Sequence, residues 1–234
     1  KMIILQPSQT RLVSNLSKKR FDNTIVFTFI GRAFYGKGGW ELLQAFERLK
    51  DLQSPVKLVV VSALAINGYR DHHVTKEIVL KSKEILSTNP LIQYYSSLPN
   101  DKVMEILRQS HVGILPSWGE TYGYSILEAM ACGCAVVAPN VSPFPEFVAP
   151  EWGWMLNVNK VFKNGIEESH VTEQNSEKMI NEIVSVVRDI VNNRDVLYSK
   201  CNAALERISS AHDPYKAAAS LETIYKESIG STNS

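Results

Sequence analysis

The chain has 234 residues, of which 44% are hydrophobic and 21% are charged, and its formal net charge at pH 7 is +1. This hydrophobic content excludes a disordered chain and is enough for a sizeable core, while the balanced charge gives no indication of a nucleic-acid partner. No apolar run reaches the roughly 18 residues that a membrane-spanning helix needs, and no secretory signal opens the chain. The first residue is Lys1 rather than Met, so we expect the chain to be a piece of a longer protein.

Residues 1–23 are interpreted as a leading segment that precedes the folded domain. Four apolar residues at positions 2–5 are followed by polar sequence that contains the basic cluster Lys18-Lys19-Arg20. We interpret this cluster as solvated linker charge. A contact with phospholipid is the alternative, although three charges contribute little membrane affinity by themselves.

The first predicted strand, residues 24–30, is followed by a glycine-rich loop and a helix. The loop contains Gly31, Arg32 and Lys37, and the helix is expected at residues 40–52. Its core-facing side chains at helical spacing are Leu42, Leu43, Phe46 and Leu49. A glycine-rich loop that enters a helix is a generic anion site, but this loop matches neither the Walker pattern nor the dinucleotide fingerprint. Arg32 and Lys37 could neutralise a diphosphate, and the alternative is that both are surface charges near a turn.

Two further strands and two helices are expected next. The strands are residues 56–63 and 91–95, and the helices are residues 75–86, capped by Thr75, and a second helix capped by Asn100 or Asp101 that ends near residue 110.

A parallel crossover unit is predicted between residues 112 and 148. The apolar run at 112–115 predicts a buried strand that Pro116 ends, a short helix is expected at 122–132, and residues 135–138 predict the next buried strand. Strand, loop, helix and strand in this order form one parallel crossover. Open parallel sheets bind ligands at the carboxyl ends of such strands.

Two acids lie within this unit, Glu120 on the loop and Glu128 in the helix, with seven residues between them. A helix that starts near Tyr122 places Glu128 roughly 9 Å along its axis, so both carboxylates can line one crevice. Helix geometry leaves the backbone N–H groups of residues 121–125 unpaired and able to receive an anion, and Gly123 lets a ligand come close to the backbone. The alternative is a core helix whose acids are simply favoured by the helix dipole.

The cysteines and histidines are weak evidence for a metal site. Cys132 and Cys134 are too close together for an easy unstrained bridge, Cys201 is remote, and an odd count suits a reducing compartment. We expect Cys132 and Cys134 to pack in the core, and the adjacent His72 and His73 to lie in a loop.

The rest of the chain predicts a short last strand and three helices. They are the strand 153–156 and the helices 172–191, 195–210 and 213–227, with an irregular polar stretch at 158–172 and a frayed tail at 230–234. Strands alternate with helices and are apolar enough to be buried on both faces. We therefore predict a doubly wound parallel α/β domain of the Rossmann-like class.

The stretch that begins at Glu120 resembles the signature of retaining glycosyltransferases with the GT-B architecture, in family four. The residues that fit are Glu120, Tyr122, Gly123, Glu128, Ala129, Met130, Ala131, Gly133, Val136, Val137 and Glu146. Gly31-Arg32 followed by Lys37-Gly38 also matches that family, whereas residues 64–69 depart from its usual Gly-x-Gly-Pro turn. The resemblance covers residues 24–157 and implies the carboxyl-terminal, donor-binding half of a GT-B fold.

The resemblance implies defined contacts with a nucleotide-diphosphate sugar. Arg32 and Lys37 would hold the pyrophosphate, and Glu120 would contact the donor sugar. These three would be the catalytic residues. Glu128 would hold the ribose hydroxyls, and backbone groups at Leu98 would contact the base. The donor-binding residues implied are Gly31, Leu98, Thr121, Tyr122, Gly123, Tyr124, Ser125 and Glu128. No metal and no other cofactor is implied.

The implied reaction is transfer of the sugar to an acceptor hydroxyl with the anomeric configuration retained. Departure of the nucleoside diphosphate develops negative charge, which Arg32, Lys37 and the N–H groups of residues 121–125 would stabilise. A non-catalytic nucleotide-sugar-binding module is one alternative, and the intact Glu120, Arg32 and Lys37 argue against it. A sugar-nucleotide epimerase is another, and it would not require this acid pair at this spacing.

We therefore predict an interdomain linker at 1–23, a nucleotide-sugar-binding domain at 24–212, and a crossing helix with a tail at 213–234. The amino-terminal acceptor domain is expected to be missing from this chain, so the chain alone should bind donor but transfer slowly or not at all. Its partners would be the nucleotide sugar, an acceptor glycan, lipid or small molecule, and its own acceptor domain, without nucleic acid. We expect a cytoplasmic location, and family habits suggest the inner face of the membrane and polysaccharide biosynthesis.

Overall fold

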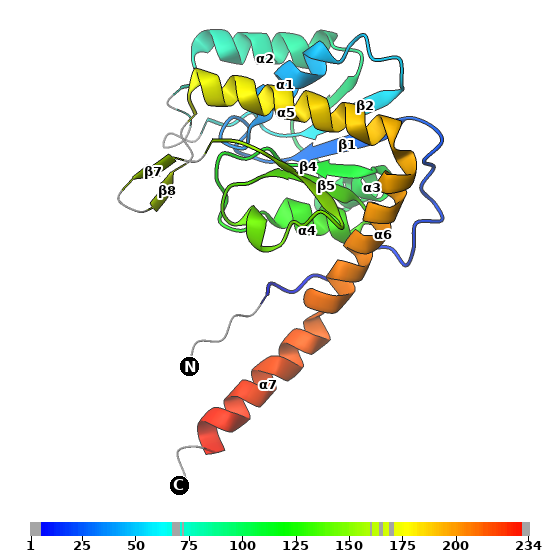
Figure 1. The fold of residues 1–234 in the computed structure, drawn as a ribbon, viewed down its shortest axis with the longest axis vertical. Helices are drawn as coiled ribbons and strands as arrows, with labels where there is room; N and C mark the ends of the chain where they lie inside the picture. The colour runs from blue at the N-terminus through cyan, green and yellow to red at the C-terminus, as the bar shows by residue number, and fades with distance from the viewer. Residues whose placement is uncertain are drawn as a thin grey trace.

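The computed structural model describes residues 6–66, 71, 73–159, 161–163, 166–168 and 171–230. A six-stranded parallel sheet lies at its centre, in the order β3-β2-β1-β4-β5-β6 (Figure 1). The strands are β1 (Ile25–Ile30), β2 (Val56–Val61), β3 (Ile92–Tyr95), β4 (Val112–Ile114), β5 (Ala135–Pro139) and β6 (Gly153–Leu156). The order reverses between β1 and β4, where such sheets leave a crevice beyond the carboxyl ends of the strands. The predicted doubly wound parallel α/β fold is confirmed.

β1 is central because its side chains are apolar on both faces. Ile25, Phe27 and Phe29 have no exposed surface, and even Thr28 is only 2% exposed. β1 pairs with all of β2 on one side and with β4 on the other. A strand buried in this way needs helices on both faces of the sheet.

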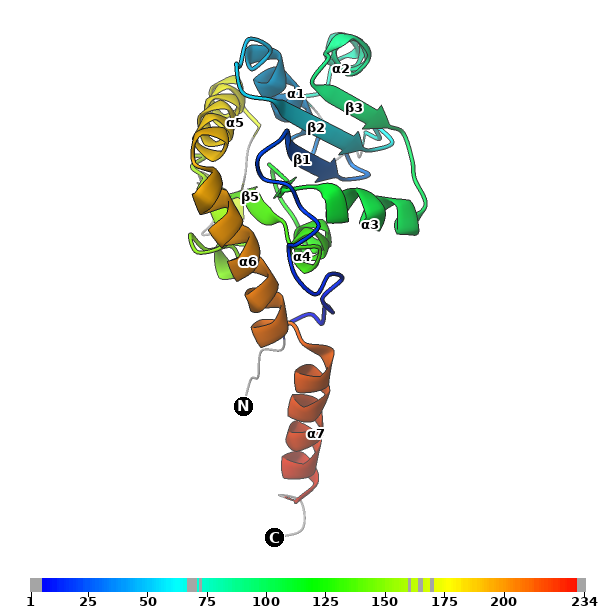
Figure 2. The same cartoon turned by 90° about the vertical axis from the view of Figure 1, so that its right-hand side faces the viewer.

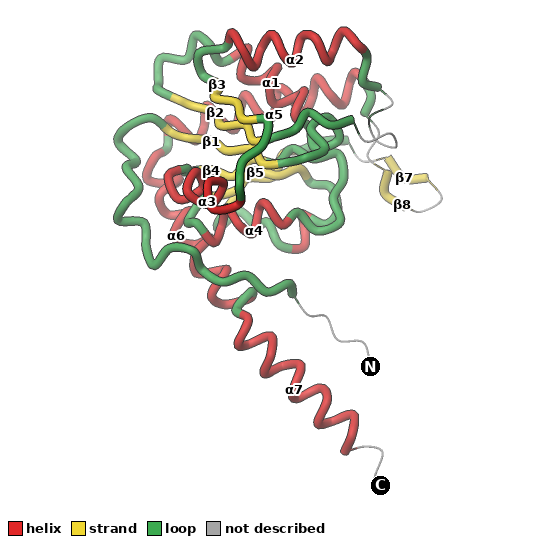
Figure 3. The backbone as a smooth tube through the Cα atoms, turned by 180° about the vertical axis from the view of Figure 1, so that it is seen from behind, coloured by secondary structure: helices red, strands yellow, loops and turns green. Residues whose placement is uncertain are grey.

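Helices cover both faces. The helices that the structure describes are α1 (Gly39–Arg48), α2 (Lys76–Thr88), α3 (Asn100–Gln109), α4 (Tyr124–Ala131), α5 (Glu173–Asn192), α6 (Arg194–Ala211) and α7 (Pro214–Gly230). α5 packs on α1 at one face (Figure 1), and α3 lies on the opposite face, as seen from behind (Figure 3). α6 packs on α4 and β5, while α7 extends away from the body of the domain (Figure 2).

Threonines cap two of the helices. The Thr75 hydroxyl accepts from the N–H of Ile78 at 3.2 Å at the start of α2, as predicted. At the start of α5, the Thr172 hydroxyl accepts from the N–H of Asn175 at 3.1 Å. The predicted cap of α3 at Asn100 or Asp101 is wrong. The carbonyl of Pro99 already accepts from the N–H groups of residues 102 and 103, both at 3.1 Å, so the two polar residues lie inside the first turn.

Several element boundaries differ from those predicted. α1 ends at Arg48 instead of near residue 52, because the chain turns back through a bond from the Leu52 N–H to the Leu49 carbonyl. The stretch predicted as irregular contains an antiparallel hairpin of β7 (Val161–Lys163) and β8 (Ile166–Glu168). These strands have three residues each, too few for a recognisable alternation. α7 continues to Gly230, where a frayed tail was expected to begin.

A few predictions fall wholly or partly outside the described residues. These are the apolar run at 2–5, the departure from the family turn at 64–69, the His72-His73 pair and the tail at 231–234. Within the described part of the chain, no helix combines the length and the apolar character needed to cross a membrane.

The leading segment packs against the domain, and Lys19 is buried beneath it. Its ammonium donates to the carbonyl of Leu107 at 3.3 Å and to that of Ser110, and it lies 3.4 Å from the Cys134 sulfur. The interpretation of Lys19 as solvated charge is therefore wrong, although Lys18 and Arg20 are exposed. The last turn of α3 offers carbonyl oxygens and the negative end of the helix dipole, both favourable for a cation.

The three cysteines are free and buried, as predicted for Cys132 and Cys134. Burial raises the pKa of Cys132 and of Cys201 to about 12, so both thiols stay protonated at neutral pH. Cys201 donates to the carbonyl of His111 and accepts from the N–H of Ala135, each at 3.3 Å. Cys201 thus serves as a small packing group between α6 and the sheet, while Cys134 donates to the carbonyls of Leu107 and Ser110 at the end of α3, each at 3.3 Å.

His111 joins the leading segment to β1. Its Nδ1 accepts from the Val26 N–H at 3.1 Å, and its Nε2 bonds to the Arg20 carbonyl at 3.1 Å, which requires the neutral tautomer with the proton on Nε2. Burial, with help from the positive charges of Lys19 and Arg194, lowers the pKa of His111 to about 4. Protonation would remove the acceptor that the Val26 N–H needs.

We predict that acid destabilises the fold through His111. Because its folded pKa of about 4 lies below the unfolded value near 6.5, its contribution is complete above pH 6.5 and is lost as the pH falls towards 4. At pH 5 the free energy of unfolding should be about 2 kcal/mol lower than at pH 7, by about 1.4 kcal/mol per pH unit. Urea denaturation of the wild type and of His111→Gln at both pH values measures this. An equal loss in both proteins would contradict the assignment.

Candidate functional site

The site is built from two loops at the carboxyl edge of the sheet. The β1 loop is residues 31–38 and the β4 loop is residues 115–123. The N–H of Trp118 donates to the carbonyl of Gly36 at 3.1 Å, and the Ser117 hydroxyl reaches the same carbonyl at 3.4 Å. These two contacts join the loops directly.

Gly38 brings the two loops together more closely than any other residue type would allow. Its φ is +72°, and a Cβ built there would lie 2.0 Å from the carbonyl oxygen of Pro116. The left-handed backbone and the lack of space both require glycine. α1 begins immediately after it, so the start of this helix is fixed against the β4 loop.

Lys37 and Glu120 form an ion pair across the two loops. The Lys37 ammonium donates to Glu120 Oε1 in a short hydrogen bond, and the two side chains are 25% and 10% exposed. The lysine stem passes over Gly31, where an added Cβ would lie 2.6 Å from Lys37 Cδ. Gly31 thus makes room for Lys37, and the structure brings these three predicted site residues together.

Arg32 follows Gly31 on the same loop and is exposed. Its guanidinium makes no hydrogen bond or ion pair with the described residues. It is therefore free to bind an anion in a bidentate manner.

α4 begins directly after the β4 loop. The helix begins at Tyr124, two residues later than predicted, because Gly123 adopts a left-handed conformation with φ +89° and acts as the N-cap. Helix geometry leaves the N–H groups of Gly123, Tyr124 and Ser125 without intrahelical partners, and no side chain caps this end. Thr121 and Tyr122 lie in the bend before the helix. The predicted stretch 121–125 is therefore divided between this bend and the first residues of the helix.

The ring of Tyr122 is fixed by a stacking contact and a hydrogen bond. It stacks on Phe147, with ring centroids 5.0 Å apart and planes 5° apart, and its hydroxyl donates to Gln6 Oε1 at 2.8 Å. The neighbouring Tyr124 is 59% exposed, with its ring centroid 5.6 Å from that of Tyr122. Tyr122 therefore ties the leading segment to the start of α4.

Glu128 lies on the second turn of α4, about 6 Å along the helix axis from the first helical residue, Tyr124. The predicted distance from the helix start, then placed near Tyr122, was roughly 9 Å. The difference follows from the later start of the helix. Its carboxyl is half-buried, and burial raises its pKa. It makes no side-chain hydrogen bond or ion pair with the described residues, so its carboxyl can accept hydrogen bonds from a ligand.

Leu98 lies after β3, two strands away from β1. It is on the same carboxyl edge of the sheet as the two loops. Its side chain packs on the core, which leaves the backbone of this turn as its polar feature.

Sequence analysis did not identify Glu41, a residue that lies directly behind the site. It belongs to the first turn of α1 and has no exposed surface. Its only sequence signal was a charged residue immediately before the core-facing Leu42. Burial raises the pKa of this carboxyl.

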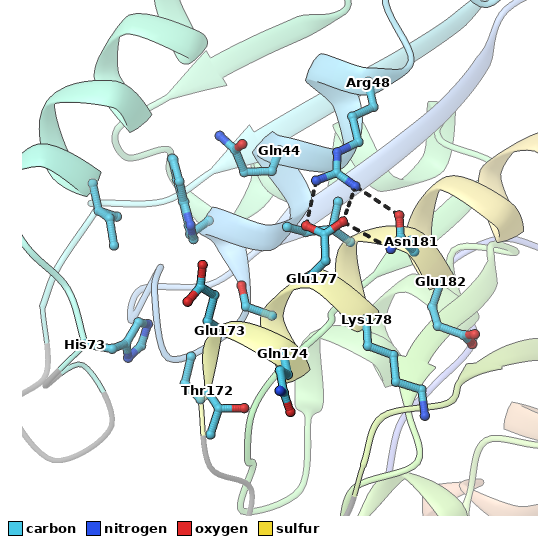
Figure 4. A pocket seen from close by; sticks show the side chains of 15 residues that line it. Gln44, Arg48, His73, Thr172, Glu173, Gln174, Glu177, Lys178, Asn181 and Glu182 are labelled. Carbon is cyan, nitrogen blue, oxygen red and sulfur yellow. Dashed lines mark hydrogen bonds and ion pairs between the residues drawn. The ribbon is translucent and has the colours of Figure 1, made fainter.

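A separate groove lies away from these two loops. It has a volume of about 1020 Å³ and lies between α1 and α5, where Arg48 bonds to Glu177 and Asn181 (Figure 4). None of the predicted site residues lines it. We place the site at the two loops, because ion pair, free N–H groups and exposed Arg32 converge there. Among the described residues, no cluster of three or more His, Cys, Asp or Glu side chains could hold a metal ion.

The chain matches a family model described as "Glycosyl transferases group 1" over residues 15–189. Similar curated proteins include the D-inositol 3-phosphate glycosyltransferase of Thermobifida fusca, 28% identical over 131 residues that cover 54% of this chain and 29% of that protein. Another is the O-antigen chain mannosyltransferase B of Escherichia coli, 30% identical over 107 residues, covering 46% of this chain and 26% of that protein. The chain thus spans less than a third of the length of these relatives.

Solved structures share the fold at lower identity. The sucrose-phosphate synthase of Thermosynechococcus elongatus superimposes with a TM-score of 0.62 at 18% identity, over 91% of this chain and 47% of that one. The C-terminal domain of a group 1 family glycosyl transferase from Francisella tularensis gives a TM-score of 0.57 at 19% identity, over 89% of this chain and 95% of that domain. These similarities confirm the Rossmann-like α/β fold of GT-B proteins.

We predict that Gly123→Ala destabilises the domain. The backbone there has φ +89°, and an added Cβ would lie 2.8 Å from Phe144 Cε1. Strain and overpacking together should lower the free energy of unfolding by roughly 2–4 kcal/mol. Urea denaturation measures the loss, with Ser125→Ala in the same turn as the control. A loss no larger than that of the control would contradict the role of Gly123.

Proposed function

This chain belongs to the family of group 1 glycosyl transferases, and from that premise we propose that it binds a nucleotide-diphosphate sugar and transfers the sugar to an acceptor hydroxyl with retention. The observation that carries the proposal is the Lys37–Glu120 ion pair, which joins the loop of the exposed Arg32 to the loop that leads into the free N–H groups of α4. Cation, carboxylate and oriented backbone are the groups that a pyrophosphate and a sugar require.

The diphosphate would be bound by positive groups from both loops. Arg32 supplies a bidentate fork, Lys37 supplies a point charge, and the N-terminus of α4 supplies N–H groups and the positive end of the helix dipole. When Lys37 turns to the phosphates, Glu120 is released. Its carboxylate then accepts hydrogen bonds from the hydroxyls of the donor sugar.

The chemical step breaks the bond between the anomeric carbon and the diphosphate oxygen. The electron pair leaves with the diphosphate, where Arg32, Lys37 and the α4 N–H groups stabilise the new charge. The acceptor oxygen attacks the anomeric carbon from the face that the diphosphate leaves, which retains the configuration, and its proton passes to the departing phosphate oxygen. Glu128 anchors the donor, because its half-buried carboxyl accepts hydrogen bonds from the ribose hydroxyls.

We propose that an amino-terminal domain of the longer protein supplies the acceptor site. The similarity over nearly all of a crystallised C-terminal domain, and over less than a third of the full-length relatives, supports this division. The acceptor would be a glycan, a lipid or a small molecule. Polysaccharide assembly is the pathway that the O-antigen relative supports.

A panel of UDP, GDP and ADP with the matching monophosphates tests donor binding. Ligand at about ten times its dissociation constant should stabilise the protein by roughly 1.4 kcal/mol, a shift of a few degrees in Tm. We expect one diphosphate to shift the Tm of this chain clearly more than its monophosphate does. The same panel on the longer protein is the control for a site that needs both domains, and no shift in either protein would contradict the proposal.

Arg32→Ala in the longer protein should lower kcat by about 100-fold or more, because it removes a group that stabilises the leaving diphosphate. The measurement is transfer of sugar from the donor that the panel identifies. Arg188→Ala, which removes an exposed arginine of α5, is the matched control and should keep normal turnover. Near-normal turnover of Arg32→Ala would remove this role from Arg32, and binding without any turnover in the unmodified enzyme would favour a non-catalytic module.

A further inference from the structure

The described part of the leading segment, residues 6–23, passes beside α4 and contacts both ends of this helix (Figure 2). At the start, the hydroxyl of Tyr122 donates to Gln6 Oε1 at 2.8 Å. At the other end, the N–H of Leu12 donates at 2.8 Å to the carbonyl of Ala131, which has no partner within the helix because it belongs to the last turn. Residues 6–12 therefore reach from the residue before the N-cap of α4 to its last residue.

Further contacts dock the same segment on the domain. The N–H of Gln9 donates to the carbonyl of His212 at 2.7 Å, and the Pro7 carbonyl oxygen lies 2.9 Å from the Nδ1 of that histidine. Leu16 is 3% exposed and covers Gly133, where an added Cβ would lie 2.5 Å from Leu16 Cδ2. The segment thus has a defined docked position, and its bond to Tyr122 is made at the edge of the candidate site.

Tyr122 lies directly before the backbone that would receive the diphosphate. It precedes Gly123, whose N–H and those of the next two residues have no partner within the helix. Consecutive Cα atoms are about 3.8 Å apart, so a shift of the Tyr122 backbone moves these N–H groups directly. Its ring is held on one face by Phe147 and at the hydroxyl by Gln6. A phenylalanine would keep the stacking contact, so the contribution of the hydroxyl is the link to the leading segment.

We propose that Tyr122 is a positioning residue, whose hydrogen bond to Gln6 couples the docking of residues 6–12 to the binding of a diphosphate at the start of α4. This inference rests on the proposed donor binding. While the segment is docked, ring and N-cap are held in one arrangement, and the anion meets N–H groups that are already oriented. Such coupling is reciprocal, so a bound diphosphate holds the segment on the domain by the same factor.

Tyr122→Phe and Gln6→Ala test the coupling in the form of the protein that binds a diphosphate in the panel. We expect each variant to weaken binding roughly 3- to 5-fold, within the effect of one ordinary hydrogen bond. The double variant should weaken it no further, because both changes remove the same bond. Calorimetric titration with that diphosphate measures the dissociation constants. Gln9→Ala removes an amide of the same segment that bonds to the adjacent Thr10 carbonyl, and this matched control should bind normally.

Trypsin cleavage after Arg11 measures the docking of the segment independently of activity. Arg11 pairs with Glu206 of α6 at 3.1 Å in the docked position, and cleavage requires the segment to open, so its rate follows the open population. A saturating diphosphate should slow cleavage of the unmodified protein by roughly the same 3- to 5-fold and leave that of Tyr122→Phe nearly unchanged. Without ligand, Tyr122→Phe and Gln6→Ala should be cleaved faster than the unmodified protein, and Gln9→Ala should not.

The outcomes separate this inference from the proposed function. Unchanged dissociation constants in Tyr122→Phe and Gln6→Ala would overturn the coupling alone, as would additive losses in the double variant. Equal protection of Tyr122→Phe and of the unmodified protein by the diphosphate would overturn it as well. If no diphosphate binds the unmodified protein in either form, the proposed donor binding fails and the coupling fails with it.

Discussion

The contact between the β1 loop and the β4 loop is the constraint on which the site depends. The two strands are neighbours only because the order of the sheet reverses between them, and the loops meet only because Gly38 has no side chain. Once that contact is made, α1 and α4 begin on opposite sides of it. The cation and the carboxylate, 83 residues apart in sequence, are then held together without any covalent link.

The two charges at the centre of the site neutralise each other. Lys37 is paired with Glu120 rather than with solvent, so neither charge must be desolvated alone. Arg32 and the N–H groups at the start of α4, for which the described residues provide no partner, belong to the same two loops as this pair. An anion that enters would exchange one partner for another, which costs less reorganisation than assembling charges from water.

The fold could be anticipated from the sequence, because apolar periodicity is a local signal. The family resemblance placed Lys37 and Glu120 at one site, but it did not predict the ion pair between them. The burial of Lys19 could not be anticipated, because its partners are carbonyls at the end of a helix about 90 residues away, and main-chain acceptors have no sequence signature. The start of α4 was misjudged for a related reason. Gly123 was recognised as permissive, but a left-handed cap and an ordinary helical turn give the same pattern. Glu41 was overlooked since a single acid on an amphipathic helix normally faces water.

The docking of the leading segment has a consequence for how the chain folds as it is made. The Pro7 carbonyl oxygen lies 2.9 Å from the Nδ1 of His212, which is 205 residues away in sequence. The N–H of Gln9 donates to the carbonyl of the same histidine. These early residues leave the ribosome long before their partners in α3, α4 and α6 exist. They cannot dock until nearly the whole domain has been synthesised. Closing the long loop between them and His212 is slow. Attachment of this segment is therefore expected to be the last step of folding, and the step most exposed to interference by neighbouring chains.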